Sequence, residues 1–182
     1  MKLMIASDIH GAADACRALL AAFDREKAER LILLGDILYH GPRNDLPAAY
    51  DPRQAAALLN DRKESILCVR GNCDAEVDQM MLAFPVLADY AVFFSGGLTV
   101  YAAHGHACGP GHLPPLRKGD ILLCGHTHVP AWEDRGDYRY FNPGSVSLPK
   151  NGSPRGYILW KADTFTWKTL DGEAYQTLTI KK

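Results

Sequence analysis

The sequence predicts a single α/β domain with two packed β-sheets and helices on the outside. In its first part, apolar runs alternate with segments of helical periodicity, as in βαβ units. The last third consists of short β-like runs separated by Gly, Pro, Asn and Asp, which favours antiparallel pairing. The 182 residues fit one domain of ordinary size, and no repeat, low-complexity tract or linker divides residues 1–182.

The N-terminal segment predicts a strand, a helix and a second strand. Lys2–Ser7 forms the first apolar run, and residues 12–23 carry apolar side chains with helical spacing. These apolar positions are Ala15, Leu19, Leu20 and Phe23. Leu31–Leu34 is an uninterrupted aliphatic run, typical of a strand buried on both faces. A βαβ order favours parallel pairing of the two strands.

The next segment predicts a loop, a helix and a third strand. Residues 37–47 contain two prolines, a glycine and an Asn-Asp pair, which indicate an irregular loop. Asp51 is the expected N-cap, with Pro52 at the first helical position and Gln54 closing a capping box. The helix continues to about Leu59, and residues 66–69 predict the third strand.

From residue 75 on, one helical segment precedes a mainly β region. Val77, Met80, Met81 and Phe84 have helical spacing. Residues 86–94 and 98–103, around a turn at Gly96-Gly97, predict a hairpin. Further β-like runs follow at 121–124, 138–141, 145–148, 157–160, 165–170 and 175–180.

Composition limits the function classes. The formal net charge of -1 predicts no stable nucleic-acid complex, and no apolar run approaches the ~20 residues of a membrane span. The first residues show no signal-peptide pattern, and Cys68 and Cys124 lie inside apolar runs rather than in a disulfide framework. A cytoplasmic location is therefore expected. A homo-oligomer stays open, with an exposed sheet edge or C-terminal Tyr and Trp residues as its interface.

Five predicted strands end in residues that can bind a metal. In chain order these residues are Asp8, His10, Asp36, Asn72, His104, His126 and His128. Ligands of α/β sheets bind outside the carboxyl ends of the strands, so we expect the seven side chains at one rim. Taken singly, each has a simpler interpretation: Asp8 could cap a helix, and Asn72 could close a turn.

Asp, Asn and His side chains together suit borderline divalent ions such as Mn²⁺, Fe²⁺, Zn²⁺ or Co²⁺ better than Ca²⁺. Seven ligands exceed the four protein groups of a tetrahedral ion, which predicts two ions. Asp36, in the middle of the set, is the best candidate for a bridging carboxylate. Two such ions lower the pKa of a bound water to about 7 and neutralise phosphate oxygens.

The ordered motifs resemble those of the calcineurin-like metallophosphoesterases. These motifs are Asp8-Ile9-His10, Gly35-Asp36, Gly71-Asn72-Cys73-Asp74, His104-Gly105-His106 and Gly125-His126-Thr127-His128. Residues 38–44 and 141–145 are similar to the small bacterial YfcE-type phosphodiesterase branch. The resemblance implies two mixed sheets flanked by helices, an α/β/β/α sandwich.

The resemblance also implies a dinuclear phosphodiesterase that hydrolyses small phosphodiesters with a metal-bound hydroxide. One ion would be held by Asp8, His10, Asp36 and His128, and the other by Asp36, Asn72, His104 and His126. The family usually works with Mn²⁺, while Fe, Zn and Ni are also seen. The types of donor atom also suit Co²⁺, which the resemblance does not add.

One position departs from the family pattern. Much of the family has histidine where this chain has Cys73, and a thiol is a poorer proton donor than an imidazolium. The general acid is therefore open, with His106 as a substitute or only a supporting residue. Arg70 could meet a phosphate oxygen or simply form a surface ion pair.

Three rival functions are less well supported. Some relatives use the fold as a protein-binding scaffold with eroded metal sites, whereas all seven matching positions are intact here. DNA nucleases with this core carry additional domains or basic surfaces, for which the chain has neither length nor charge. A metallo-β-lactamase-type hydrolase needs a compact His-x-His-x-Asp-His run, which is absent from the sequence.

Overall fold

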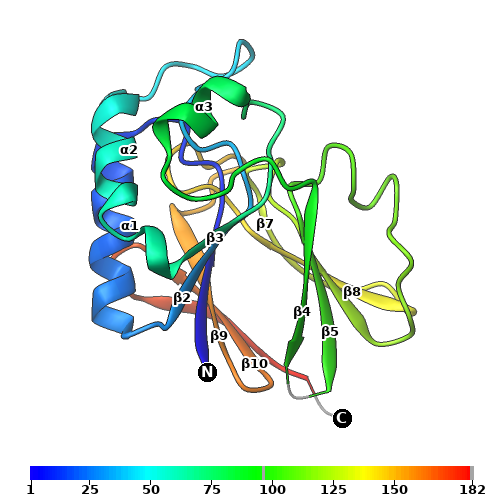
Figure 1. Ribbon diagram of the computed structural model, residues 1–182. Coiled ribbons are helices and arrows are strands. Elements are labelled where there is room, and N and C mark those ends of the chain that lie inside the picture. Colours follow the sequence, from blue (N-terminus) through cyan, green and yellow to red (C-terminus); the bar gives the residue numbers. More distant parts are fainter. Residues whose placement is uncertain (96, 181–182) are drawn as a thin grey trace.

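The computed structural model describes residues 1–95 and 97–180, which form two β-sheets with helices (Figure 1). The elements are β1 (Lys2–Ala6), α1 (Ala13–Glu26), β2 (Arg30–Leu33), α2 (Pro52–Asn60), the 3₁₀ turn η1 (Lys63–Ser65), β3 (Ile66–Cys68), α3 (Glu76–Met81), β4 (Tyr90–Ser95), β5 (Leu98–Ala103), β6 (Asp120–Leu123), β7 (Pro130–Asp134), β8 (Tyr138–Pro143), β9 (Gly156–Lys161), β10 (Thr164–Thr169) and β11 (Ala174–Thr179). The expected two-sheet architecture is confirmed.

Both sheets are mixed. The six-stranded sheet has the order β11-β10-β9-β1-β2-β3, in which β1, β2 and β3 run parallel to one another. The five-stranded sheet has the order β4-β5-β6-β8-β7, in which β5, β6 and β8 are parallel. The predicted βαβ unit and the β4–β5 hairpin are confirmed, although Gly96 of the predicted turn lies outside the described residues.

Alternation along the strands builds the core. In β1, Leu3 and Ile5 belong to the apolar cluster between the sheets, whereas Met4 and Ala6 face the helices. Aromatic side chains from β8, β9 and β10 complete the inner cluster, including a stacked pair of Trp160 and Phe165 with ring centroids 5.0 Å apart. This rigid double layer holds the strand ends in place.

The two outer faces are covered differently. Helices α1 and α2 lie on the six-stranded sheet (Figure 1), and Asp51 caps α2 by accepting a hydrogen bond from the Gln54 backbone N–H at 2.9 Å. On the five-stranded sheet, the loop after β5 takes the place of a helix. Its Leu116 packs against the outer apolar cluster, which is formed by Leu122, Cys124, Tyr138 and Tyr140.

The structure differs from the sequence prediction in two places. Residues 145–148 are a loop rather than a strand, and the hydroxyls of Ser145 and Ser147 donate hydrogen bonds to the Asp8 carbonyl at 2.8 and 3.0 Å. Residues 130–134 form a strand that the sequence did not predict, because Pro, Glu and Asp obscure the pattern.

Within the described ranges, no helix has the length and apolar character that a membrane span requires.

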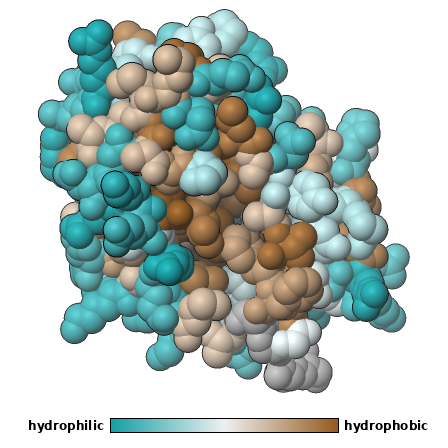
Figure 2. Space-filling model, in the orientation of Figure 1, coloured by the Kyte–Doolittle hydropathy of each residue, from teal (hydrophilic) through white to brown (hydrophobic). Residues whose placement is uncertain are grey.

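The edge strands β3 and β4 lie at the front of the molecule (Figure 1). Apolar side chains gather there around a hollow, as Figure 2 shows in the same orientation. Its lining includes Ile66, Leu67, Pro85, Ala91 and Phe93. This face lies along the strands, away from the rim that carries the metal-binding candidates.

Candidate metal centre

The structure brings all seven predicted metal ligands to one rim. They follow β1, β2 and β3 of one sheet and β5 and β6 of the other. Backbone hydrogen bonds join neighbouring strand ends, from Asp8 N–H to Gly35 O at 3.1 Å and from Gly125 N–H to His104 O at 2.9 Å. The His126 N–H donates to Asp8 Oδ2 at 3.0 Å and so connects the two sheets.

Five of these residues have left-handed backbone conformations. Their φ angles are 59° for Asp8, 50° for His10, 55° for Asp36, 66° for His126 and 61° for His128. Such conformations cost about 1–3 kcal/mol each for non-glycine residues and cluster at functional sites. At Gly71 the backbone approaches Asp36 too closely for any side chain, because a Cβ there would lie 2.1 Å from Asp36 Oδ1.

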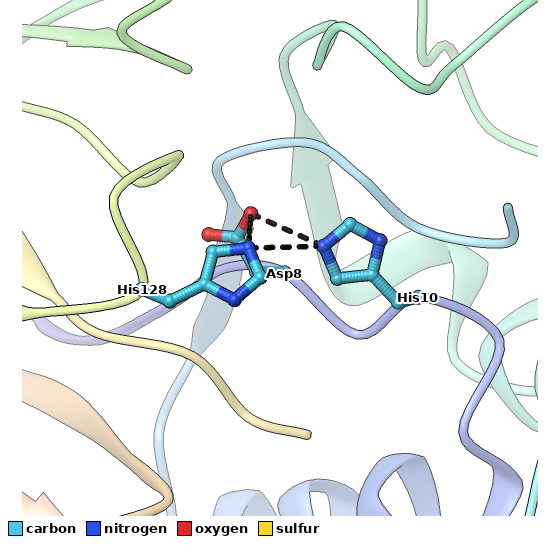
Figure 3. A group of neighbouring side chains, drawn as sticks. All are labelled: Asp8, His10 and His128. Atoms are coloured by element: carbon cyan, nitrogen blue, oxygen red, sulfur yellow. Dashed lines mark hydrogen bonds and ion pairs between the residues drawn. The ribbon is translucent and has the colours of Figure 1, made fainter. Parts of the chain in front are cut away.

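Asp8, His10 and His128 form a closed cluster, in which all three side chains are buried (Figure 3). Asp8 Oδ1 lies 3.5 Å from His10 Nε2 and 3.3 Å from His128 Nε2, and the two nitrogens are 3.2 Å apart. The Nδ1–H groups of His10 and His128 donate to the carbonyls of Tyr39 and Leu148 at 2.8 and 2.7 Å. In the neutral rings, Nε2 therefore carries the lone pair.

Asn72, His104 and His126 form an open cluster beside it. His104 Nε2 lies 3.1 Å from Asn72 Oδ1 and 3.2 Å from His126 Nδ1. Its Nδ1–H donates to the Leu34 carbonyl at 2.6 Å. Asp36 Oδ2 lies 3.4 Å from His104 Nε2 and 3.7 Å from His10 Nε2, so Asp36 stands between the two clusters.

The closed cluster fits a bound cation. Asp8 Oδ1 is buried and accepts no hydrogen bond from the described residues. With Nε2 of both histidines deprotonated, three lone pairs would point at one another without a partner. A positive charge between them removes this conflict, and oxygen and nitrogen donors suit a divalent metal ion.

Charge coupling affects the pKa values of the cluster residues. Burial alone would raise the pKa of Asp8, but its contacts with His10 and His128 hold it well below its ordinary value. Burial alone would lower the pKa of His104, but the Asp36 hydrogen bond and the charges of Asp8 and Asp36 raise it to about 9. Without metal ions, protonated histidines such as His104 therefore supply positive charge beside Asp8 and Asp36.

Asp74 holds two ligand-bearing loops together. Its Oδ2 accepts hydrogen bonds from the backbone N–H groups of Asp36 at 2.8 Å and Gly71 at 2.7 Å, and its Oδ1 accepts from Ile37 N–H at 2.8 Å. The carboxylate therefore ties the end of β2 to the end of β3. Its motif was visible in the sequence, but this positioning role was not.

The three candidate catalytic residues have different surroundings. The Cys73 backbone N–H donates to Asp36 Oδ1 at 2.8 Å, while burial and the Asp36 charge raise the pKa of its thiol to about 12. The His106 ring lies 5.4 Å from that of His104, between centroids. Arg70 Nε donates to the Asp74 carbonyl at 3.2 Å, and neither Arg70 nor His106 is among the described residues that line the cavity over the clusters.

That cavity has a volume of about 290 Å³ and a polar lining. Four of the candidate ligands line it, Asp36, Asn72, His126 and His128, together with Cys73 and with Gly41, Pro42, Arg43, Asn44, Thr127 and Lys150. Neither Arg43 nor Lys150 forms an ion pair with any described residue. Sequence reasoning missed Lys150, because nothing local distinguishes it among 20 Lys and Arg residues.

Comparisons with known proteins show the family to which this chain belongs. Residues 1–164 match the family model described as the calcineurin-like phosphoesterase superfamily domain. The chain is 45% identical to phosphodiesterase YfcE of Escherichia coli (strain K12) over 174 residues, covering 96% of this chain and 95% of the relative. The solved structure of YfcE, a phosphoesterase from E. coli, superimposes with a TM-score of 0.96 at 43% identity over the full length of both chains.

More distant structures share the fold alone. Vps29 from Entamoeba histolytica, solved in complex with Zn²⁺, has a TM-score of 0.65 at 17% identity, over 98% of this chain and 99% of that one. The extent of the family match and the identity to YfcE show where this chain belongs. It is a member of the calcineurin-like phosphoesterase superfamily.

Proposed function

We propose that this phosphoric diester hydrolase uses two divalent metal ions to cleave small phosphodiesters, with Mn²⁺ as the first candidate and Fe, Zn, Ni or Co as alternatives. The observation that carries the proposal is the convergence of seven oxygen and nitrogen donors in two clusters joined by Asp36. The 45% identity to a curated phosphodiesterase supports the reaction class.

In this proposal, one ion is held by the closed cluster and the other by the open cluster. The first set is Asp8, His10, Asp36 and His128, and the second is Asp36, Asn72, His104 and His126. When bound, two such ions promote ionisation of a water and neutralise charge on the phosphate oxygens. The protein contributes by preorganising the donors, since three histidines are oriented by carbonyl groups.

Asp36 is suited to the bridging role. Its Oδ1 accepts the Cys73 N–H, which leaves Oδ2 facing both His10 and His104. Arg43 and Lys150 at the cavity wall attract an anionic phosphate and orient its free oxygens. These two cations are the phosphate-binding residues of the proposal.

Proton donation to the leaving group is the weak step. The Cys73 thiol, with a pKa of about 12, is a poor acid near neutral pH. Burial and the neighbouring His104 charge lower the pKa of His106, so this ring is mostly neutral as well. The site therefore favours diesters whose leaving group departs as a stable anion, such as an aryl oxide.

We also propose a cytoplasmic location and no stable association with nucleic acid or membrane. The apolar front face in Figure 2 is the proposed surface for self-association. Five free cysteines suit a reducing compartment. Sedimentation of the purified chain tests self-association directly.

The test of the main proposal combines metal analysis with a substrate panel. Protein reconstituted with Mn²⁺ is expected to hold close to two ions per chain and to hydrolyse bis-p-nitrophenyl phosphate much faster than p-nitrophenyl phosphate. Chelation should abolish turnover, and Mn²⁺ should restore it. Turnover that survives chelation in protein free of transition metal would refute the dinuclear mechanism.

A further inference from the structure

A second cavity, of about 340 Å³, lies directly beside the metal cavity. It is formed by the loop after β2, the start of α2, and α3, at the top of the molecule in Figure 1. Most of its lining is apolar or aromatic: Leu38, Tyr39, Tyr50, Ala75, Val77 and Met81. Most of the residues that line the metal cavity, in contrast, are polar or charged.

The apolar wall of this cavity is open to water. Val77 is 63% exposed, Met81 is 45% exposed and Tyr39 is 42% exposed. The helical spacing predicted from Val77 to Phe84 is confirmed only for α3, because Phe84 lies beyond the end of this helix. Phe84 is buried, whereas α3 does not bury Val77 and Met81 in the core. Exposed apolar groups in a concave site next to reactive residues are typical of ligand contacts.

Cys73 lies between the two cavities, because it belongs to the lining of both. A Cβ placed on Gly41 would lie 2.8 Å from the Cys73 sulfur, so the thiol already fills the space under the loop after β2. Tyr39 gives a second connection. Its side chain lines the apolar cavity, while its carbonyl accepts the hydrogen bond that orients His10.

The polar groups of the second cavity do not call for a charged occupant. The Asp78 carboxylate accepts a hydrogen bond from the Ala75 backbone N–H at 2.7 Å and is buried, so it is occupied in capping α3. Arg53 adds a single exposed cation near the start of α2. The apolar side chains therefore dominate what the cavity can recognise.

From this adjacency we propose that the second cavity is a substrate subsite, which receives an uncharged aromatic or branched aliphatic ester group while the phosphate lies over the two clusters. Val77 and Met81 contact this group, and the small Cys73 side chain forms the boundary over which it reaches from the metal cavity into the second cavity. The proposal rests on the phosphodiesterase function proposed above and narrows its substrates to diesters with one bulky apolar alcohol.

The test uses phosphonates, because each carries one organic group and can use only one such subsite. Methylphosphonate and phenylphosphonate are compared as competitive inhibitors of methyl p-nitrophenyl phosphate hydrolysis by the Mn²⁺-loaded protein, at a pH where both are dianions. The natural chain should bind phenylphosphonate about tenfold more tightly, the scale expected for burying one apolar group. Val77→Asp and Met81→Asp should reduce this preference to about twofold or less.

Met80→Asp is the matched control. Met80 lies on the same helix and is 85% exposed, but it does not line the cavity, so this variant should keep the full preference. Inhibition by methylphosphonate and metal content should be the same in all three variants. Retention of the preference in Val77→Asp and Met81→Asp, or its equal loss in Met80→Asp, would overturn the subsite.

Calorimetric titration of the same phosphonates separates this proposal from the activity itself. If the loaded protein does not turn over phosphodiesters, the proposed function fails, but the binding preference and its loss in the two variants can still be measured. If turnover is normal and the titrations show no preference for phenylphosphonate, the subsite fails and the proposed function stands.

Discussion

The closed and open clusters differ in burial and in charge. Asp8, His10 and His128 are buried, whereas Asn72 is exposed and His126 is only partly covered. The closed cluster has its own carboxylate in addition to Asp36, while the open cluster adds a neutral amide. More negative charge and less solvent should give the closed cluster the tighter, more slowly exchanging ion. The open cluster is then the one that meets solvent and substrate.

The hydrogen bonds around the rings point the same way. In the closed cluster a backbone carbonyl fixes both rings, His10 and His128, whereas in the open cluster it fixes only His104. His126 Nδ1 faces His104, and its Nε2 has no hydrogen-bond partner among the described residues. Partners behind a ligand orient it and raise its basicity. The comparison predicts unequal metal affinities at two sites built from similar side chains.

Asp36→Asn should have the largest effect, because it removes the carboxylate between the clusters. Both ions should bind more weakly, and the hydrolysis rate should fall by at least about a hundredfold, the scale of losing several kcal/mol of charge stabilisation. Elemental analysis and turnover of bis-p-nitrophenyl phosphate measure the two effects. Asp45→Asn, an exposed aspartate in the following loop, is the control and should behave like the natural chain. Normal metal content in Asp36→Asn would show that another residue bridges.

His128→Ala and His126→Ala should separate the two clusters. After extensive desalting, His126→Ala is expected to keep about one ion per chain. His128→Ala should weaken the affinity for the tightly held ion by about tenfold to a hundredfold or more, and should lose most activity with that ion. Inductively coupled plasma measurements on both variants check this, with circular dichroism as a test of folding. Equal retention of metal in the two variants would remove the proposed asymmetry.

The candidate ligands were predictable because they follow a repeated local pattern. Each comes directly after an apolar strand, and parallel strands deliver their carboxyl ends to one rim. The division into a closed and an open cluster was not visible, since burial of Asp8 or exposure of Asn72 depends on loops that pack from distant parts of the chain. The same is true of the hydroxyls of Ser145 and Ser147, which hold the Asp8 carbonyl from residues 137 and 139 positions away.

Helical periodicity also has a limit here. It correctly located α3, but it reports only which side chains share a face, not what covers that face. Val77 and Met81 have the spacing of core residues and lie at an open cavity. Likewise, Lys150 becomes a candidate only when folding places it beside His128, whose carbonyl accepts a hydrogen bond from the Lys150 N–H at 3.2 Å, in the lining of one cavity. Such residues need the three-dimensional arrangement.

The pH dependence of the ion-free protein should show the charge coupling at His104. Its pKa is raised from 6.5 to about 9 in the folded chain, so its contribution to stability is full below pH 6.5 and is lost as the pH rises through about 9. The loss is roughly 3 kcal/mol. Thermal denaturation of chelated protein between pH 6.5 and 9 should show a falling melting temperature.

Metal affinity should change in the opposite direction over the same range. Because binding requires the deprotonated His104 nitrogen, affinity for Mn²⁺ should rise by up to about tenfold per pH unit toward pH 9. Titration calorimetry at several pH values measures this rise. His112→Gln, in an exposed loop, is the control that should leave both dependences intact. A melting temperature of the chelated protein that does not fall would contradict the assigned coupling.

Cys73→Ala should have the smallest effect, although the sulfur lies within 4.8 Å of the possible ligand atoms of His10 and Asp36. Its thiol is protonated near neutral pH, because burial and the Asp36 charge raise its pKa to about 12. The contact that matters to Asp36 comes from the Cys73 backbone N–H, which the substitution retains. Cys73→Ala should therefore keep both ions and stay within about tenfold of the natural rate on bis-p-nitrophenyl phosphate, since a nucleophile or ligand would cost far more.

Cys73→His tests what the thiol lacks. An imidazolium at this position can protonate a poor leaving group and favours the extra negative charge of a monoester dianion, effects worth about 10²–10⁴-fold for a well-positioned acid. The ratio of p-nitrophenyl phosphate to bis-p-nitrophenyl phosphate hydrolysis should rise, whereas the metal content should not change. Because the larger ring would take up space at the boundary of the two cavities, the preference for phenylphosphonate should fall in the same variant. Complete loss of turnover in folded, fully metallated Cys73→Ala would instead give the thiol a direct chemical role.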